Sequence, residues 1–339
     1  MADPDDIATE PTERPSRLRR WLRSPWTWAV TALLAVALVL RLWGIRYGLP
    51  FAYNLDERSH FVPRAVEFFR AGSINPDYQL NPSGLIEWIA LALGVVHRSS
   101  NGVVTTWNTH PGEIWAVARV AGALMATAAI GLLYAAGARF FDRWVGLLAA
   151  ALLAVCFLPV HYGHLALNDA PSLAPTALCL FAVAGILRHG RWWDYLLAGV
   201  AVGFAVGFKY NAAFLLLPIV TVAAIVAVRG SEDAEGAHPD AWWPRLRPAV
   251  LGLLIAGGGA IVGFFLCDPY AFLDPSRFKE DVQHLSDYTK GGLLLGETRR
   301  NGWEYYLWSI GWGFGYLPAL LTLLGGIMLL VRDRLRALI

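Results

Sequence analysis

The sequence has few charged residues: Asp, Glu, Lys and Arg make up 16% of its 339 residues, against about 25% in soluble domains. The net charge of +2, with no Lys/Arg run of the nucleic-acid-binding kind, argues against a nucleic-acid partner. The three cysteines, Cys156, Cys179 and Cys267, lie in or at the end of apolar runs without metal-type spacing, which argues against a disulfide framework. No internal repeat or low-complexity segment is present. Hydrophobic residues are abundant, at 56% of the chain with a mean hydropathy of +0.45, and they indicate a polytopic membrane protein.

The apolar runs predict an all-α transmembrane bundle of about eight spans, because a helix of about 20 apolar residues crosses a bilayer. Residues 1–25, acidic and then basic, are expected to form a disordered cytoplasmic tail, and residues 26–339 the transmembrane domain. The expected spans are 26–45, 114–137, 144–162, 170–187, 195–211, 212–228, 249–267 and 304–331.

The apolar run 83–97 is short and carries Glu87. If it does not span and the N-terminus is cytoplasmic, the arginine clusters after the later spans all face the cytoplasm, as the positive-inside rule favours. We therefore expect 83–97 to be interfacial or re-entrant. The outer face then receives a long first loop over 46–113, a turn at 163–169 and a last loop over 268–303, and the expected location is the plasma membrane.

Two adjacent acids, Asp56 and Glu57, follow the first span. Residues 58–70 after them have apolar positions at helical spacing and charges on the other face, which predicts an amphipathic helix lying on the membrane surface. The acids would sit near its N-terminus, where a capping role is the alternative to catalysis. Asn81 lies in an Asn-Pro-Ser-Gly turn further along this loop, and it is a candidate polar group beside Asp56.

Arg119 lies inside the second span, where a charge is costly and usually has a partner or a function. We expect it to pair with a carboxylate or a phosphate, with snorkelling to the headgroups as the alternative. His161, His164 and Asp169 cluster at the outer end of the third span. They leave a divalent-metal site open, and Asp169 is alternatively the N-cap of the fourth span.

Lys209 and Tyr210 end the fifth span, and Asp268 opens the last outer loop ahead of an expected amphipathic helix over 275–288. Lys209 suits either the dipole of a helix C-terminus or an anionic lipid phosphate. Carboxylates and cations gathered at one membrane surface fit transfer from a lipid phosphate: cations hold the leaving phosphate, and a carboxylate takes a proton from the acceptor hydroxyl. A carrier would instead place charges near mid-bilayer.

These motifs, in this order, resemble the family 39 membrane glycosyltransferases, which include protein O-mannosyltransferases and aminoarabinose transferases. The resemblance covers roughly residues 40–300. It rests on Leu55-Asp56-Glu57, Gly72-Ser73-Ile74-Asn75-Pro76, Asn81-Pro82-Ser83, Ala118-Arg119, His164 to Asp169-Ala170-Pro171, Gly199 to Gly207-Phe208-Lys209-Tyr210-Asn211-Ala212, and Asp268-Pro269-Tyr270 with Leu273-Asp274.

The resemblance implies the C-type glycosyltransferase fold and a polyprenyl-phosphate-linked sugar as donor. It implies Asp56 as catalytic base or acceptor-binding carboxylate, with Glu57 beside it, and phosphate contacts from Lys209 and Arg119. The expected partners are the lipid-linked donor, membrane lipids and a hydroxyl acceptor on protein, lipid or glycan, and a homo- or hetero-oligomer is compatible with the chain. The alternatives are a transporter or lipid flippase, and a non-catalytic subunit of a glycosylation complex, which the short C-terminal part favours.

Overall fold

The computed structural model describes residues 24–232, 242–291 and 302–332, and in these residues the regular structure is helical. Residues 1–23 of the expected tail and residues 292–301 of the expected 268–303 loop therefore lie outside the described residues. The helices are α2 (Pro25–Leu42), the π-helix η1 (Glu57–Phe61), α3 (Val62–Ala71), α4 (Gly84–His97), α5 (Ser100–Thr109), α6 (Pro111–Phe140), α7 (Arg143–Val155), α8 (Phe157–Tyr162), α9 (Leu173–His189), α10 (Trp192–Phe208), the 3-10 helix η2 (Tyr210–Leu215), α11 (Leu216–Glu232), α12 (Trp242–Cys267), α13 (Tyr270–Leu273), α14 (Pro275–Gly291), α15 (Gly302–Phe314) and α16 (Tyr316–Arg332).

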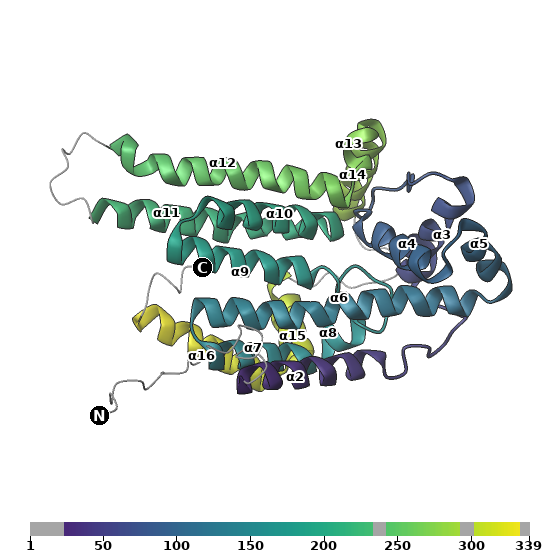
Figure 1. Cartoon of the computed structure of the whole chain (residues 1–339), viewed down its shortest axis with the longest axis horizontal. Coiled ribbons are helices and arrows are strands. Elements are labelled where there is room, and N and C mark those ends of the chain that lie inside the picture. Colours follow the sequence, from purple (N-terminus) through teal and green to yellow (C-terminus); the bar gives the residue numbers. More distant parts are fainter. Residues whose placement is uncertain (1–23, 233–241, 292–301, 333–339) are drawn as a thin grey trace, which may run out of the picture.

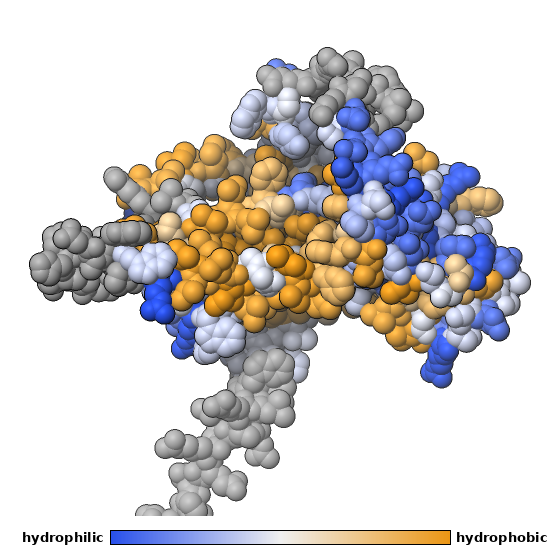
Figure 2. All heavy atoms as spheres, turned by 90° about the horizontal axis from the view of Figure 1, so that it is seen from above, coloured by the Kyte–Doolittle hydropathy of each residue, from blue (hydrophilic) through white to orange (hydrophobic). Residues whose placement is uncertain are grey.

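The long helices run roughly side by side along the molecule, and α3, α4, α5, α13 and α14 gather at one end (Figure 1). We call this the loop end. Apolar side chains cover much of the bundle surface seen in Figure 2, whereas hydrophilic side chains collect over the loop end. An apolar belt of this kind is what a membrane-embedded bundle presents to lipid, and it identifies a multi-pass membrane protein.

Four helical segments of the described chain are long and apolar enough to span: Pro25–Leu42, Pro111–Phe140, Tyr210–Val228 and Leu246–Cys267. Helices α15 and α16 would add a fifth if they count as one span, but they are bent by 111°. Helices α7, α9 and α10 are apolar but shorter. The helical membrane architecture is thus as predicted, while the number of eight spans and the C-type fold stay predictions.

Two of the expected spans consist of two helices each instead of one continuous helix. The run 144–162 breaks at Cys156, which is extended with a ψ of 130°, because Pro159 lacks the N–H that would continue the helix. The run 304–331 bends at Gly315, whose φ of +98° lies outside the helical region.

Small residues bring α10 and α12 together. A Cβ at Gly199 or Gly203 would collide with the backbone of Ala256 or Ala260, and one at Gly207 would lie 2.6 Å from the Cβ of Cys267. Spacing small residues four apart lets two membrane helices approach closely. This packing continues to the loop end, where Gly84 at the start of α4 abuts Cys267 and the carbonyl of Gly207.

The first loop forms the amphipathic helix that was predicted. Helix α3 buries Val62, Ala65, Val66 and Phe68 against α4, α5 and α6. Helix α4 has 14 residues, or about 21 Å at 1.5 Å per residue, which is shorter than the roughly 30 Å hydrocarbon core. The expected helix over 275–288 is present as α14.

Candidate functional site

The side chains of Asp56 and Glu57 lie in different environments at the start of η1. The side-chain oxygen of Asn54 accepts hydrogen bonds from the backbone N–H groups of Asp56, at 3.0 Å, and Glu57, at 3.2 Å. Asn54 therefore caps this helix, and the Asp56 carboxylate makes no capping hydrogen bond. The following turn directs Glu57 into the protein and leaves the Asp56 side chain 61% exposed.

Glu57 and Arg119 form a buried bidentate ion pair. Arg119 Nε lies 2.7 Å from Glu57 Oε1, and Nη2 lies 2.9 Å from Oε2. Arg119 Nη1 donates to the carbonyls of Ile45 and Tyr47, and the Ala166 N–H donates to Glu57 at 3.0 Å. The expected carboxylate partner of Arg119 is thus Glu57, and the pair joins the end of α2, the first loop, α6 and the turn over 163–169.

Asp56 borders an aromatic and cationic cluster. Its carboxylate lies 3.8 Å from His60 Nε2, and the His60 ring stacks on Tyr78 with centroids 5.1 Å apart. The Arg64 guanidinium lies 4.3 Å from the Tyr78 centroid, and Asn81 donates to the Tyr78 hydroxyl at 2.7 Å. Burial raises the pKa of Tyr78, opposed by the Asn81 hydrogen bond and Arg64. Asn81 therefore reaches the neighbourhood of Asp56 through Tyr78 and His60.

Lys209 and Asp169 form a second ion pair, and both side chains are more than a third exposed. Asn168 donates to the carbonyl of Phe208 at 2.8 Å, which ties the turn before α9 to the end of α10. The alternative of Asp169 as an N-cap is wrong, because α9 begins at Leu173 with Ser172 at its N-cap position and the Asp169 carboxylate is taken by Lys209. The pair is accessible, unlike Glu57–Arg119.

His164 is held by two backbone carbonyls. Its Nδ1 lies 2.8 Å from the oxygen of Val160 and its Nε2 lies 3.0 Å from that of Trp43. Both partners are backbone carbonyl oxygens, which only accept hydrogen bonds. His161 instead stacks on Phe157. In the part of the chain that the structure describes, no three His, Cys, Asp or Glu side chains form a metal-binding group.

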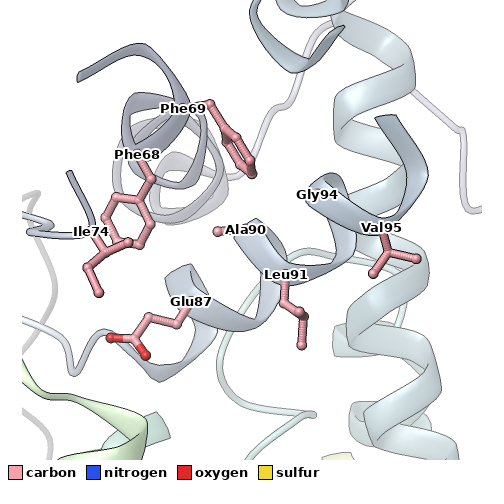
Figure 3. A pocket seen from close by; sticks show the side chains of 8 residues that line it. All are labelled: Phe68, Phe69, Ile74, Glu87, Ala90, Leu91, Gly94 and Val95. Atoms are coloured by element: carbon pink, nitrogen blue, oxygen red, sulfur yellow. The ribbon is translucent and has the colours of Figure 1, made fainter. Parts of the chain in front are cut away.

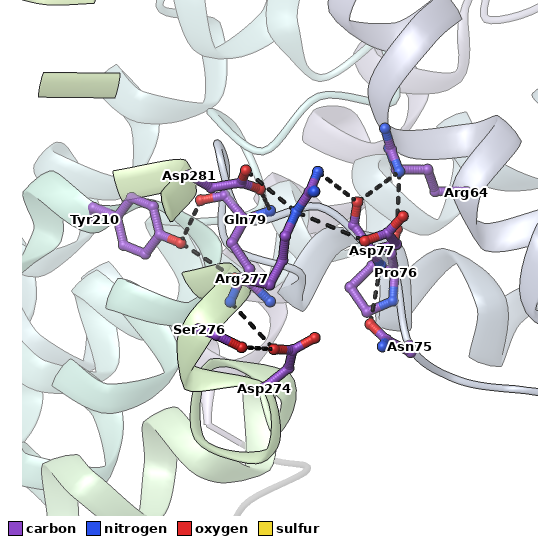
Figure 4. Close-up of polar contacts among 10 residues, drawn as sticks. All are labelled: Arg64, Asn75, Pro76, Asp77, Gln79, Tyr210, Asp274, Ser276, Arg277 and Asp281. Carbon is purple, nitrogen blue, oxygen red and sulfur yellow. Dashed lines mark hydrogen bonds and ion pairs between the residues drawn. The ribbon is translucent and has the colours of Figure 1, made fainter. Parts of the chain in front are cut away.

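Tyr210 and Asp268 meet the first loop through Gln79. The Tyr210 hydroxyl donates to the Gln79 carbonyl at 2.9 Å, and Gln79 Nε2 donates to Asp268 at 3.0 Å. Asp268 is fully buried. The Gln79 N–H donates to Asp281 on α14 at 2.6 Å. Figure 4 shows the contacts of Gln79 with Tyr210 and Asp281, which draw the first and last loops together.

Arginines reinforce this junction. Arg277 Nε lies 3.3 Å from Asp281 Oδ1 and 3.6 Å from Asp77 Oδ1, and Arg64 donates to the Pro76 carbonyl at 2.8 Å (Figure 4). Burial lowers the pKa of Arg64, and the largest effect in the opposite direction is the electrostatic interaction with Tyr78. Hydrogen bonds from the Arg277 backbone and Ser276 lower the pKa of Asp274. Polar contacts therefore join residues 77–79 of the first loop to α14.

Among the residues that the structure describes, three buried charged residues were missed in the sequence: Arg41, Asp194 and Asp281. Arg41 in α2 is fully buried and donates to the carbonyls of Ala37, Leu153 and Ala154. The last two carbonyls end α7, where the helix dipole is negative and stabilises a cation. The sequence signal for Arg41 was its position inside the first apolar run, where a charged residue usually has a partner or a function.

The predicted site residues thus fall into groups at one end of the bundle: Asp56 with the Asn81 cluster, Glu57 with Arg119, Lys209 with Asp169, and Tyr210 with Asp268. Within the described part of the chain, no hydrogen bond or ion pair joins Asp56 to Arg119 or Lys209. The fold and the site thus define a class of protein: a helical membrane protein that carries exposed and buried ionic groups at one end of its bundle.

Residues 112–234, about a third of the chain, match the model of the dolichyl-phosphate-mannose-protein mannosyltransferase family. The match confirms the resemblance to a family 39-like membrane glycosyltransferase. It includes Arg119, His164, Asp169, Lys209 and Tyr210, and it does not extend to the first loop. No curated protein matches the chain in a sequence search.

Proposed function

We propose that this protein transfers a sugar from a polyprenyl-phosphate-linked donor to a hydroxyl acceptor at the outer face of the plasma membrane. The N-terminus would be cytoplasmic, so that the loop end faces outward. Dolichyl phosphate, the lipid named in the matching family's description, is itself a polyprenyl phosphate, which supports the donor class.

The observation that carries this proposal is the exposed carboxylate of Asp56. Its neighbour Glu57 is fully buried and paired with Arg119, whereas Asp56 is 61% exposed and reaches only His60 at 3.8 Å among the contacts of the described residues. A catalytic base must be reachable by the hydroxyl whose proton it removes. Asp56 meets that requirement, and Glu57 has the contacts of a structural residue.

In the proposed reaction the acceptor oxygen attacks the anomeric carbon while the bond from that carbon to the phosphate oxygen breaks. The acceptor's proton passes to Asp56, and the bonding electrons leave with the polyprenyl phosphate. A single displacement of this kind inverts the anomeric centre. Lys209 is our candidate for the phosphate, because its ammonium group is partly exposed and its partner Asp169 is equally accessible.

Arg119 is a weaker candidate for the phosphate than the sequence suggested. All three of its guanidinium nitrogens donate to Glu57 or to backbone carbonyls. We therefore assign Arg119 to holding Glu57 and the first loop. The buried Arg41 and the Arg139–Asp194 pair are likewise occupied by internal contacts, which favours structural roles over a transport path.

The experiment is transfer by the purified full chain in proteoliposomes, supplied with a panel of polyprenyl-phosphate sugars and hydroxyl acceptors. Formation of a glycosylated product with inverted anomeric configuration is expected with at least one donor. A product from nucleotide sugars, or donor flipping across the bilayer without any transfer, would contradict the proposal. Transfer only after a second glycosyltransferase chain is added would support the non-catalytic subunit instead.

A further inference from the structure

Ser83 lies between two carboxyl groups at the start of α4. Its hydroxyl oxygen is 3.0 Å from Glu87 Oε1 and 2.9 Å from Asp268 Oδ1. Asp268 comes from the end of α12, so this contact crosses between the first loop and the bundle. The three groups form one short hydrogen-bonded chain.

The chain needs a proton on one of the two acids. A serine hydroxyl has a single proton to donate, and an ionised carboxylate only accepts. With both acids ionised, one of the two contacts would place a hydroxyl oxygen against a carboxylate oxygen with no proton between them. Both contacts become hydrogen bonds when one acid is protonated and donates to Ser83 Oγ, while Ser83 donates to the other.

Asp268 has the surroundings of the ionised member. It also accepts from Gln79 Nε2 at 3.0 Å and from the Ser83 backbone N–H at 3.2 Å. Hydrogen bonds to the charged form of a carboxyl group stabilise that form. Asp268 also faces the N-terminus of α4, where the helix dipole favours an anion.

Glu87 has the surroundings of the protonated member. An apolar groove of about 440 Å³ lies between α3 and α4. Figure 3 shows Glu87 at one end of this groove, which Phe68, Phe69 and Ala90 also line. Burial raises the pKa of this carboxyl group from 4.5 to about 8, opposed by the Ser83 hydrogen bond. The titratable groups that reach it come from α12, namely Asp268 and the Cys267 thiol, while α3 presents phenylalanines.

The chain continues toward the site. Asp268 holds Gln79, and the Gln79 carbonyl accepts from Tyr210. Residues 78–83 are thereby fixed to the ends of α10 and α12. Tyr78 in this segment stacks on His60, which faces Asp56.

From this geometry we infer that Glu87 and Asp268 share one proton through Ser83, and that Glu87 and Ser83 are positioning residues that fix the 78–83 segment beside Asp56. The positioning role rests on the proposed function, whereas the shared proton does not. Loss of the proton places a second negative charge next to Asp268 and leaves one of the two Ser83 hydroxyl contacts without a hydrogen bond, which weakens the attachment of the first loop to the end of α12.

Infrared difference spectroscopy of the purified full chain tests the shared proton. We expect a carboxylic-acid carbonyl band that disappears as the pH rises through about 8 and that is absent from Glu87→Gln. In Ser83→Ala the band should move to higher frequency, because the acid loses its hydrogen-bond acceptor. A wild-type spectrum without a titrating band that Glu87→Gln removes would overturn the inference.

Transfer activity against pH tests the positioning role. A glutamine amide donates to Ser83 as the protonated acid does, so Glu87→Gln should keep wild-type activity and lose the decline above about pH 8, whereas Glu87→Ala should lose activity at every pH. An unchanged alkaline decline in Glu87→Gln would overturn the role. If no donor supports transfer, the proposed function fails. The infrared band then still shows whether Glu87 and Asp268 share a proton.

Discussion

Helices α10 and α12 meet through glycine and alanine, whereas the loop end is held by a buried ion pair and a chain of hydrogen bonds. Small residues allow close backbone contact without any polar group to satisfy. Buried polar groups, by contrast, stabilise only when every partner is present. The stability of the bundle should therefore be sensitive to side-chain volume, and that of the loop end to the loss of a charge.

The largest loss of stability is expected from Arg119→Met. It leaves the Glu57 carboxylate buried without its cation, which typically costs about 3–5 kcal/mol. Thermal unfolding in detergent, followed by size-exclusion chromatography, measures the effect. The matched control is Arg70→Met, because Arg70 pairs with Glu67 at 3.1 Å while both side chains are about half exposed. Equal losses in the two variants would contradict the assigned role of Arg119.

A smaller loss is expected from Gly203→Ala in the bundle. The added methyl would collide with the backbone of Ala260, and overpacking of this kind costs about 1–3 kcal/mol. Gly257→Ala on α12 is the control, because a Cβ there meets nothing within 4 Å. The same thermal assay should find the control unchanged or slightly stabilised, since alanine favours helix over glycine. A stable Gly203→Ala would show that α10 and α12 can move apart freely.

Stability should also depend on pH through Glu87. Its pKa is raised in the folded protein, from 4.5 to about 8, so the folded state binds more protons than the unfolded state between these values. Its contribution is therefore fully present below the unfolded pKa and is lost as the pH rises through about 8. Melting temperatures should fall over this window in the wild type and less in Glu87→Gln. Parallel curves for the two proteins would contradict a partly buried, protonated Glu87.

The smallest change in stability is expected at the Lys209–Asp169 pair. Both side chains are more than a third exposed, and exposed pairs contribute about 0–1 kcal/mol. Lys209→Met should thus unfold close to the wild-type temperature while the KM for the lipid-linked donor rises. Asp169→Asn is the matched control for loss of the ion pair, because it keeps the cation. A donor KM that rises equally in both variants would assign Lys209 to structure instead of phosphate binding.

The sequence allowed the membrane class and the amphipathic α3 to be predicted, because both depend on local apolar spacing. Apolar length alone also favoured continuous helices over 144–162 and 304–331, and it did not weigh Pro159 or the backbone freedom of Gly315 enough to predict their breaks.

The candidate site was predictable in its residue types but not in its pairing. Arg119 was expected to meet a carboxylate, yet nothing local identifies that carboxylate as Glu57, 62 residues away. Asp56 and Glu57 are adjacent and chemically alike, and only the turn at η1 separates their environments. Ser83 looked like part of a proline turn, and its contact with Asp268 depends on the packing of α4 against α12.

The division of roles between Asp56 and Glu57 is the central claim, and Asp56→Asn compared with Glu57→Gln tests it most directly. The measurement is the initial rate of sugar transfer per folded protein, with thermal stability recorded for each variant. Asp56→Asn should keep wild-type thermal stability and lose about 10²–10⁴-fold in transfer rate, as removal of a general base does. Glu57→Gln should instead lower the thermal stability of the protein. Full transfer by a stable Asp56→Asn protein would contradict the account.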